Sequence, residues 1–386
     1  MRDIAIQQRE NDLVLGTFGR GFYVLDDYSL LRDIGDGKME ETATIYPVRD
    51  ALMYEEAKPL GISGKAFQGD GFYSAENLGP VAMIDFYYPE SHKSRKDKRE
   101  KAQAKLKKDN RDNPYPTYDE LLEEADEIAP QLMFTFSDSK GKVVRKMYKE
   151  PSKGIQRIKW DMRFASKAAI NLNRSSVYNP FAGSNSGTLV APGTYTVSMS
   201  MVDANGVEMI AGPVSFNVKA LDNSVMPAAN RDDKVAFQRD VAELSRRING
   251  TGRAISEINN KLRHIKEAIK AVESQGDGLI NDYNSINMSM KEIRRALNGD
   301  DIKTRLDIDQ IPTPSSRIGW IEYEQRSTTS APTETHRMSF AIAKEEFEPI
   351  VEKVKRIATV DIVKLEQKLE DMGAPYTPGR AVMMIE

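Results

Sequence analysis

The residues of this sequence best suited to proton transfer are three histidines, and the sequence contains no cysteine. His92 begins a charged segment, His264 lies on the polar side of a predicted helix, and His336 lies near a helix start. The Gly-x-Ser-x-Gly turn of serine hydrolases is absent, and so are the His-x₃-His and His-Glu-x-x-His spacings of metal sites. The absence of cysteine removes disulfides and thiolate nucleophiles. We therefore predict no catalytic residue, metal site or cofactor in this chain.

A glycine-rich segment, Gly16–Gly21, resembles a phosphate-binding loop at first sight. Such a loop must open onto a helix whose N-terminus meets the phosphate. Here the next residues, Phe22–Leu25, are typical of a strand, and no Lys-Ser/Thr pair precedes them. We interpret the segment as a bulged turn between strands.

Glycoside hydrolysis needs only two carboxyl groups about 5–10 Å apart in a cleft. The chain has 58 acidic residues, so its sequence cannot select such a pair. Asp203–Gly206 and Asp138–Gly141 carry oxygen ligands of the calcium type, but each segment is better explained as a hairpin turn.

The two tryptophans are the candidate contacts for a ligand or partner. Trp160 lies in a strand pattern whose alternate residues point inward, so its main interpretation is a core residue, with ligand stacking as the alternative. Trp320 lies in a short helix predicted over 317–325.

Length and composition indicate a multidomain protein of the β plus α class. The chain has 386 residues, 40% of them hydrophobic and 29% charged, which suits two or three globular domains. Its net charge of −3 gives no field that attracts nucleic acid. No run of 18 apolar residues is present, so we expect no membrane span.

Period-two patterns predict β-structure over residues 1–30 and 44–220. The first segment reads as short strands around tight turns. The second contains seven short strands, which suit an immunoglobulin or fibronectin type III-like sandwich. Asn205-Gly206 is the strongest hairpin signal. The predicted strands are 45–54, 81–88, 131–137, 143–148, 156–164, 193–203 and 213–219.

A charged insertion, about 93–128, interrupts these strands. Residues 93–108 contain nine Lys or Arg, and residues 119–127 contain six acids. A basic run can bind nucleic acid, but no aromatic residues are interleaved with this one. We predict a solvated helical hairpin whose two arms attract each other.

From 233 to 386 the apolar residues recur at three- and four-residue steps, which predicts an antiparallel helical bundle. We expect Asn249-Gly250 and Asn298-Gly299 to end helices. Pro349 is expected to kink or break the last helix, and Asp361 to cap its final segment. The tail after Gly373 is predicted to be extended. A partner-binding coiled coil is the alternative to a buried bundle core.

Five segments resemble, in the same order, the C-terminal region of secreted bacterial sortilin-like (VPS10-like) and BNR-repeat glycosyl hydrolase-type β-propeller proteins. The resemblance covers most of the chain and is specific for architecture rather than activity. It implies that residues 1–30 are the remnant of the last propeller blade. The matching segments are GTFGRGFYVLDD (16–27), YPVRDALMY (46–54), GIQRIKWDMRF (154–164), APGTYTVSMSM (191–201) and LEDMGAPYTPGR (369–380).

The resemblance implies a non-catalytic accessory region of an exported protein, in which the sandwich braces the propeller and the bundle contacts a protein, a cell-envelope component or a glycan. The alternative is part of a sialidase-like exo-glycosidase whose catalytic propeller lies upstream; a peptidase-associated scaffold is a third. We expect an extracellular, periplasmic or cell-surface location, with further blades and an export signal encoded before Met1. A cytoplasmic location also suits a cysteine-free chain.

Overall fold

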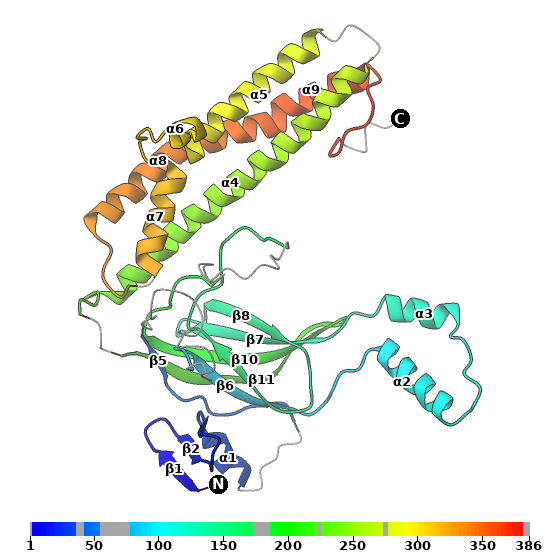
Figure 1. The fold of residues 1–386 in the computed structure, drawn as a ribbon, viewed down its shortest axis with the longest axis vertical. Coiled ribbons are helices and arrows are strands. Elements are labelled where there is room, and N and C mark those ends of the chain that lie inside the picture. The colour runs from blue at the N-terminus through cyan, green and yellow to red at the C-terminus, as the bar shows by residue number, and fades with distance from the viewer. Residues whose placement is uncertain are drawn as a thin grey trace. The chain divides into compact units, whose positions relative to one another are not determined.

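The computed structural model describes residues 2–35, 42–54, 78–172, 186–221, 225–272, 277–326 and 328–380. The chain is a β plus α protein that divides into two compact units (Figure 1). The first unit holds three sheets and the helices α1–α3, and the second holds the helices from α4 onward. Each unit is described by itself.

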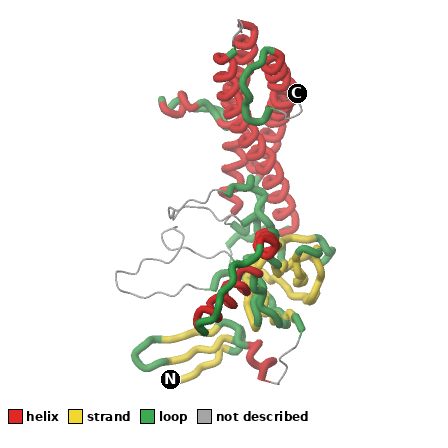
Figure 2. The backbone as a smooth tube through the Cα atoms, turned by 90° about the vertical axis from the view of Figure 1, so that its right-hand side faces the viewer, coloured by secondary structure: helices red, strands yellow, loops and turns green. Residues whose placement is uncertain are grey.

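The chain begins with a small antiparallel sheet of order β1-β2-β3, drawn as three yellow strands near the N-terminus in Figure 2. Its strands are β1 (Asp3–Gln7), β2 (Asp12–Gly16) and β3 (Phe22–Leu25), and the short helix α1 (Ser29–Gly35) follows. The glycine-rich segment is the turn between β2 and β3, as predicted. We did not predict α1.

Two further sheets share one hydrophobic core. The larger has the order β5-β11-β10-β7-β8 and the smaller β4-β6-β9. The ring of Phe86 lies 4.8 Å from that of Phe134 across the sheets, and Trp160 stacks on Phe136 at 4.7 Å. The bounds are β4 (Thr44–Ile45), β5 (Ala51–Met53), β6 (Ala82–Tyr88), β7 (Gln131–Asp138), β8 (Val143–Lys149), β9 (Gly154–Trp160), β10 (Gly193–Asp203) and β11 (Gly206–Ala220).

Three predicted strands differ from the observed ones. The strand predicted over 45–54 is two short strands in different sheets, because the chain crosses between sheets over 46–50. The strand predicted to end at 164 ends at Trp160, since Met162 has a φ of 53° that extended backbone does not allow. The last strand begins at Gly206, directly after the predicted Asn205-Gly206 turn. The hairpin is confirmed, and it is longer than the sequence indicated.

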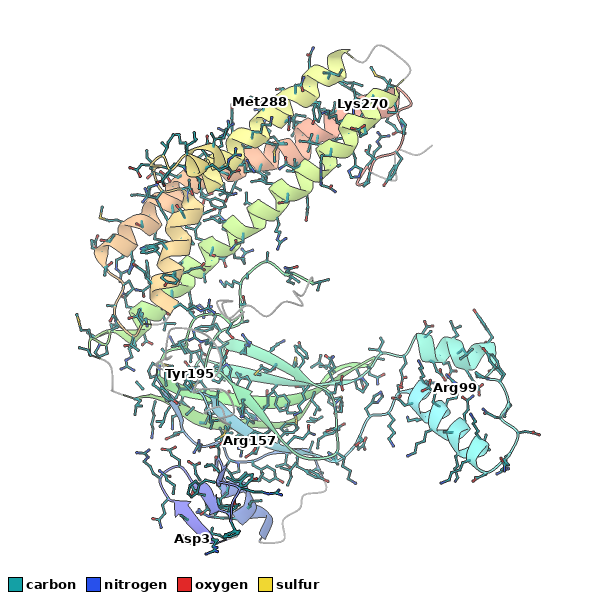
Figure 3. All side chains as sticks on the ribbon, in the orientation of Figure 1. Asp3, Arg99, Arg157, Tyr195, Lys270 and Met288 are labelled. Carbon is teal, nitrogen blue, oxygen red and sulfur yellow. The ribbon has the colours of Figure 1, made fainter. Side chains whose placement is uncertain are left out.

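The charged insertion forms two helices, α2 (Arg95–Lys108) and α3 (Tyr118–Ala125). Both begin with a capping box, from Ser94 and Thr117, and neither contributes a buried residue. Arg99, labelled in Figure 3, binds the carboxylate of Glu124 through two hydrogen bonds of 2.5 and 2.9 Å. The predicted attraction between the two arms is confirmed.

The second unit is built from long helices around one apolar core. Its elements are α4 (Arg231–Ala271), α5 (Asp277–Asn298), α6 (Asp301–Arg305), α7 (Pro314–Arg326), α8 (Glu334–Arg356), a π-helical segment (Ile357–Asp361) and α9 (Ile362–Asp371). In Figure 1, α5 runs back along α4, and α8 and α9 run beside both. The predicted apolar stripe of α4 is buried, with Ile265 fully inaccessible.

Three helix boundaries differ from the predictions. Helix α4 continues through Asn249-Gly250, because Ile248 and Ile255 lie seven residues apart and an unbroken helix buries both. Pro349 lies inside α8, so of the two expected effects, a break and a kink, the break does not occur. Asp361 has helical backbone angles and makes no capping hydrogen bond, since the π-helical segment joins α8 to α9 without a new start. By contrast, Asn298-Gly299 does end α5.

The glycines inside α4 lead to a prediction about stability. A methyl group added at Gly250 or Gly252 meets nothing within 4 Å. We expect Gly250→Ala and Gly252→Ala each to raise the free energy of unfolding by about 0.5–1 kcal/mol, because alanine loses less backbone entropy in a helix. Urea unfolding followed by the helical circular dichroism signal measures this change.

Gly299→Ala is the matched control. Gly299 has a φ of 94°, and a Cβ atom added there would lie 3.3 Å from the side-chain oxygen of Gln310. This variant is expected to be less stable by about 1–2 kcal/mol. Destabilisation of the helical unit by Gly250→Ala would mean that the chain breaks at this point.

Candidate functional site

The three histidines lie in different elements, His92 in the first unit and the other two on separate helices of the second. His92 lies before α2, with its Nε2 atom 3.8 Å from a Glu127 oxygen. His264 is exposed on α4, and His336 is buried at the start of α8. Among the described residues no three His, Asp or Glu side chains are grouped closely enough to hold a metal ion.

The buried His336 joins two helices of the second unit. Its Nδ1 atom accepts a hydrogen bond of 3.1 Å from the backbone N–H of Thr333, so the neutral ring carries its proton on Nε2. Nε2 lies 2.5 Å from a Glu324 oxygen, and the Gln325 amide lies 3.3 Å from Nδ1. These contacts connect α7 to the first turn of α8.

The two tryptophans differ in their exposure to solvent. Trp160 has no exposed surface, and its indole Nε1 donates a hydrogen bond of 3.0 Å to the Arg163 carbonyl. It is a core residue, so its candidate role as a ligand or partner contact is wrong. Trp320 is exposed on α7, within the helix expected there.

The most unusual surface in the first unit is the β1-β2-β3 sheet. All four residues of β3 are large and apolar, and all four are exposed, with Phe22 81% and Tyr23 53% accessible. Successive side chains in a strand point to opposite faces, so both faces of β3 are uncovered. On β1, Ile4 and Ile6 are also exposed. Apolar surface of this extent marks a site of interaction with another structure.

An arginine fixes this sheet to the larger core. Arg157 on β9 lies opposite Asp85 on β6 and binds its carboxylate through two hydrogen bonds of 2.7 and 2.8 Å. The same guanidinium donates to the backbone carbonyls of Asp26, at 2.8 Å, and Asp27, at 3.0 Å, which directly follow β3. The hydrogen bonds to Asp85 raise the pKa of Arg157 above its usual value, so the group stays charged. Figure 3 labels Arg157.

A second arginine supports the same junction. Arg49 lies in the crossover between β4 and β5 and donates a hydrogen bond of 2.5 Å to the carbonyl of Glu10. Its Nε atom lies 3.5 Å from the buried carboxylate of Asp27. The hydrogen bonds and ion pairs of this junction therefore join charged side chains to backbone carbonyls and carboxylates. Only the strand register reveals that Asp85 lies opposite Arg157.

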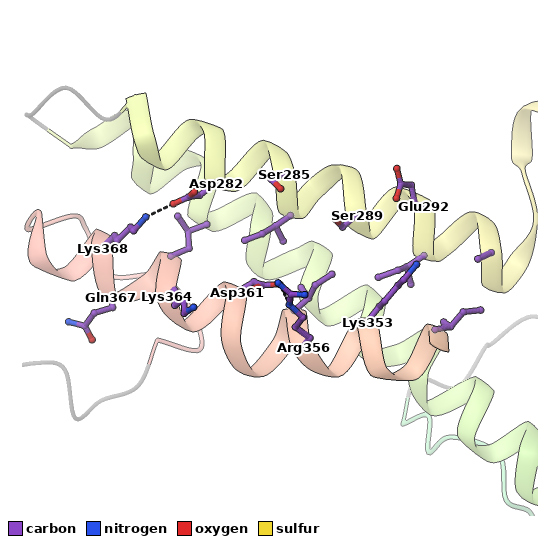
Figure 4. Close-up of a pocket in the computed structure, with 16 residues that line it drawn as sticks. Asp282, Ser285, Ser289, Glu292, Lys353, Arg356, Asp361, Lys364, Gln367 and Lys368 are labelled. Atoms are coloured by element: carbon purple, nitrogen blue, oxygen red, sulfur yellow. Dashed lines mark hydrogen bonds and ion pairs between the residues drawn. The ribbon is translucent and has the colours of Figure 1, made fainter. Parts of the chain in front are cut away.

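The second unit contains a groove of about 800 Å³ between α5 and the α8–α9 segment (Figure 4). The π-helical segment lines this groove, and π-bulges within α-helices occur frequently at functional sites. Two ion pairs cross or flank it: Lys368 with Asp282 at 2.6 Å, and Arg356 with Asp361 at 3.7 Å. The groove also contains Lys353 and Lys364, Ser285 and Ser289, Glu292, and buried isoleucines and leucine.

The charges of the groove suit a polar partner. Lys353 and Lys364 line it, and neither forms an ion pair within the described residues. The floor residues Ile286, Ile357 and Leu365 are already buried. The lining has four basic and three acidic side chains, a small positive excess, and its floor is covered, so an acidic segment fits it better than an apolar one.

Comparisons with known proteins give no identification. No protein-family model matches the chain, and no curated protein matches it. No helix in the described part of the chain has the length and apolar character needed to cross a bilayer.

The Arg157 junction leads to a prediction. We expect Arg157→Ala to leave Asp85 and two carbonyls without their donor, and to weaken the attachment of the β1-β2-β3 sheet by about 1.5–3 kcal/mol. Amide exchange in residues 3–25 should then accelerate by about tenfold or more. Hydrogen exchange followed by mass spectrometry measures the exchange rate of these amides.

Lys159→Ala provides the matched control on the same strand. Lys159 is exposed and lies two residues from Arg157. This variant should leave exchange in residues 3–25 unchanged. Equal exchange in the Arg157→Ala protein and the unmodified protein would contradict a role for Arg157 at the junction.

Proposed function

We propose that this chain is a non-catalytic accessory region of an exported β-propeller protein, which braces the propeller and contacts a partner. The observation that carries the proposal is the β1-β2-β3 sheet, in which every residue of β3 is apolar and exposed. A propeller blade has this character before its neighbours cover it, because each blade buries both faces against the next.

The finer architecture belongs to the same proposal. We assign residues 1–30 to the last blade of the propeller, 44–220 to an immunoglobulin or fibronectin type III-like sandwich, and 233–386 to an antiparallel helical bundle. The shared core of two sheets supports the second assignment, and the long helices around one apolar core support the third. The charged insertion is an elaboration of the sandwich.

The chemistry of the junction supports the proposed bracing role. Arg157 and Arg49 attach the blade through backbone carbonyls and carboxylates, which leaves the apolar faces of the blade free for its neighbours. Charge-assisted hydrogen bonds are directional, so they hold the blade in one orientation. The sandwich would in this way fix the closing blade.

The helical unit would make the outward contact. Its groove between α5 and α8–α9 offers Lys353 and Lys364 to an acidic segment of a protein or cell-envelope partner. A glycan is the other partner class that we propose. The location that follows is extracellular, periplasmic or at the cell surface.

A second candidate function is part of a sialidase-like exo-glycosidase. The same uncovered sheet favours it, because the catalytic groups would come from other blades of the propeller. Release of a fluorogenic sialoside by the propeller-containing polypeptide, and not by the 386-residue chain, would favour this candidate over a purely structural role.

The proposal predicts that one double variant has different effects in the 386-residue chain and in a longer polypeptide that contains the propeller. Phe22 and Val24 point to the same face of β3, and both are exposed. We expect the double variant Phe22→Ser, Val24→Ser to change the stability of the 386-residue chain by less than about 0.5 kcal/mol. In the polypeptide that contains the propeller, the same change should cost about 3–6 kcal/mol, because two large side chains leave a buried interface. Thermal unfolding of both proteins measures the difference.

Val207→Ser is the control, since Val207 is exposed on β11 and belongs to no proposed interface. It should be neutral in both proteins. The proposal fails if antibodies against the helical unit detect only a polypeptide of 386 residues in the cells that make it, or if the double variant is neutral in a longer one.

A further inference from the structure

A hollow in the second unit, separate from the charged groove, is lined by the exposed Trp320. Its volume is about 420 Å³, within the usual range for small-ligand sites. The end of α5, the loop over 310–313, the first turns of α7 and one residue of α8 contribute its walls.

The exposed aromatic side chains of α7 are not needed for packing, and of the two only Trp320 lines the hollow. Helix α7 buries Ile318 and Ile321 against its neighbours, whereas Trp320 is 61% and Tyr323 73% exposed. The two exposed rings lie three residues apart on one helix face, with centroids separated by 5.9 Å and planes inclined by 32°. They form an accessible aromatic surface that the fold itself does not use.

The wall opposite is held rigid by hydrogen bonds. Gln310 accepts from the backbone N–H of Asp300 at 2.7 Å, and its amide nitrogen donates to the Asp300 carbonyl and to the Thr304 hydroxyl. Ser316 caps the start of α7 by accepting from the Thr313 N–H at 2.8 Å. The loop therefore keeps one position beside Trp320, so a ligand would meet a largely preformed site.

The polar groups of the hollow are mostly neutral. Asn298 accepts a hydrogen bond from Ser315, but its amide nitrogen forms none within the described residues, and the same holds for the Ser339 hydroxyl. No acidic residue lines the hollow. The one cation, Arg317, is largely buried, and its Nε atom lies 4.0 Å from a Glu346 oxygen. An exposed indole and free amide and hydroxyl groups that line the same hollow suit a ligand with one apolar face and a hydroxylated edge.

We propose that this hollow binds a pyranose ring of a glycan. The C–H face of the sugar stacks on the indole of Trp320, and its hydroxyl groups bind the Asn298 amide and the Ser339 hydroxyl. The proposal gives a site to the glycan contact in the proposed function, and it rests on that part alone. It does not depend on the propeller.

The two tryptophans make a direct experiment possible with the intact chain. Trp160 is fully buried, so a sugar can contact only the indole of Trp320. The probes are trisaccharides of glucose, N-acetylglucosamine, galactose and mannose. At least one is expected to shift the tryptophan emission saturably and to protect it from acrylamide quenching. Calorimetric titration of that trisaccharide then gives an affinity, which Trp320→Ala should lower at least tenfold.

The controls separate stacking from a general loss of structure. Tyr115→Ala removes an aromatic side chain that is 87% exposed in the charged insertion, and it should leave the affinity unchanged. Trp320→Phe should keep part of the affinity. Both Trp320 variants should unfold at the temperature of the unmodified chain, since the side chain is exposed.

Three results would overturn the proposal: no trisaccharide alters the emission, affinity is unchanged in Trp320→Ala, or decaproline binds where the trisaccharides do not. The last result would indicate a site for proline-rich peptides. None of these results bears on the bracing role, which is argued from the exposed strand β3 and from the Arg157 and Arg49 contacts.

Discussion

The arrangement of the first unit depends on the alternation of side chains along β9. Ile158 and Trp160 point into the core shared by two sheets, so Arg157 must project from the opposite face. There it meets Asp85 on the neighbouring strand and the two carbonyls that end the N-terminal sheet. Strand β9 thus packs into the core through its apolar residues and binds the β1-β2-β3 sheet through Arg157.

This junction requires an arginine. The guanidinium makes two bonds to one carboxylate and still has donors for two carbonyls, which a lysine ammonium cannot reproduce in this planar geometry. Asp85 is nearly buried, so loss of Arg157 leaves a carboxylate without its partner at a site where water reaches it poorly. The junction is consequently specific in orientation, and it leaves the apolar faces of β3 uncovered.

The second unit presents two surfaces of different chemistry. The groove beside the π-helical segment carries a small excess of basic side chains over a buried apolar floor, whereas the hollow beside Trp320 has an exposed indole, neutral polar groups and one largely buried arginine. These properties favour different partners, an acidic segment for the first and a sugar for the second.

By itself the sequence determined the two rhythms of β-structure and long helices, the Asn205-Gly206 hairpin, the opposed charges of the insertion and the short helix that carries Trp320. Local signals suffice there, because each depends on periodicity or on neighbouring residues. The tertiary structure decided the rest. Asn249-Gly250 and Asn298-Gly299 carry the same helix-ending signal, yet only the second ends a helix: Ile248 and Ile255 stay in phase across the first, whereas Ile302 and Leu306 beyond the second are exposed. The pairing of Arg157 with Asp85, 72 residues apart, likewise follows from strand register. Such contacts depend on which elements pack together, and no local pattern in the chain encodes them.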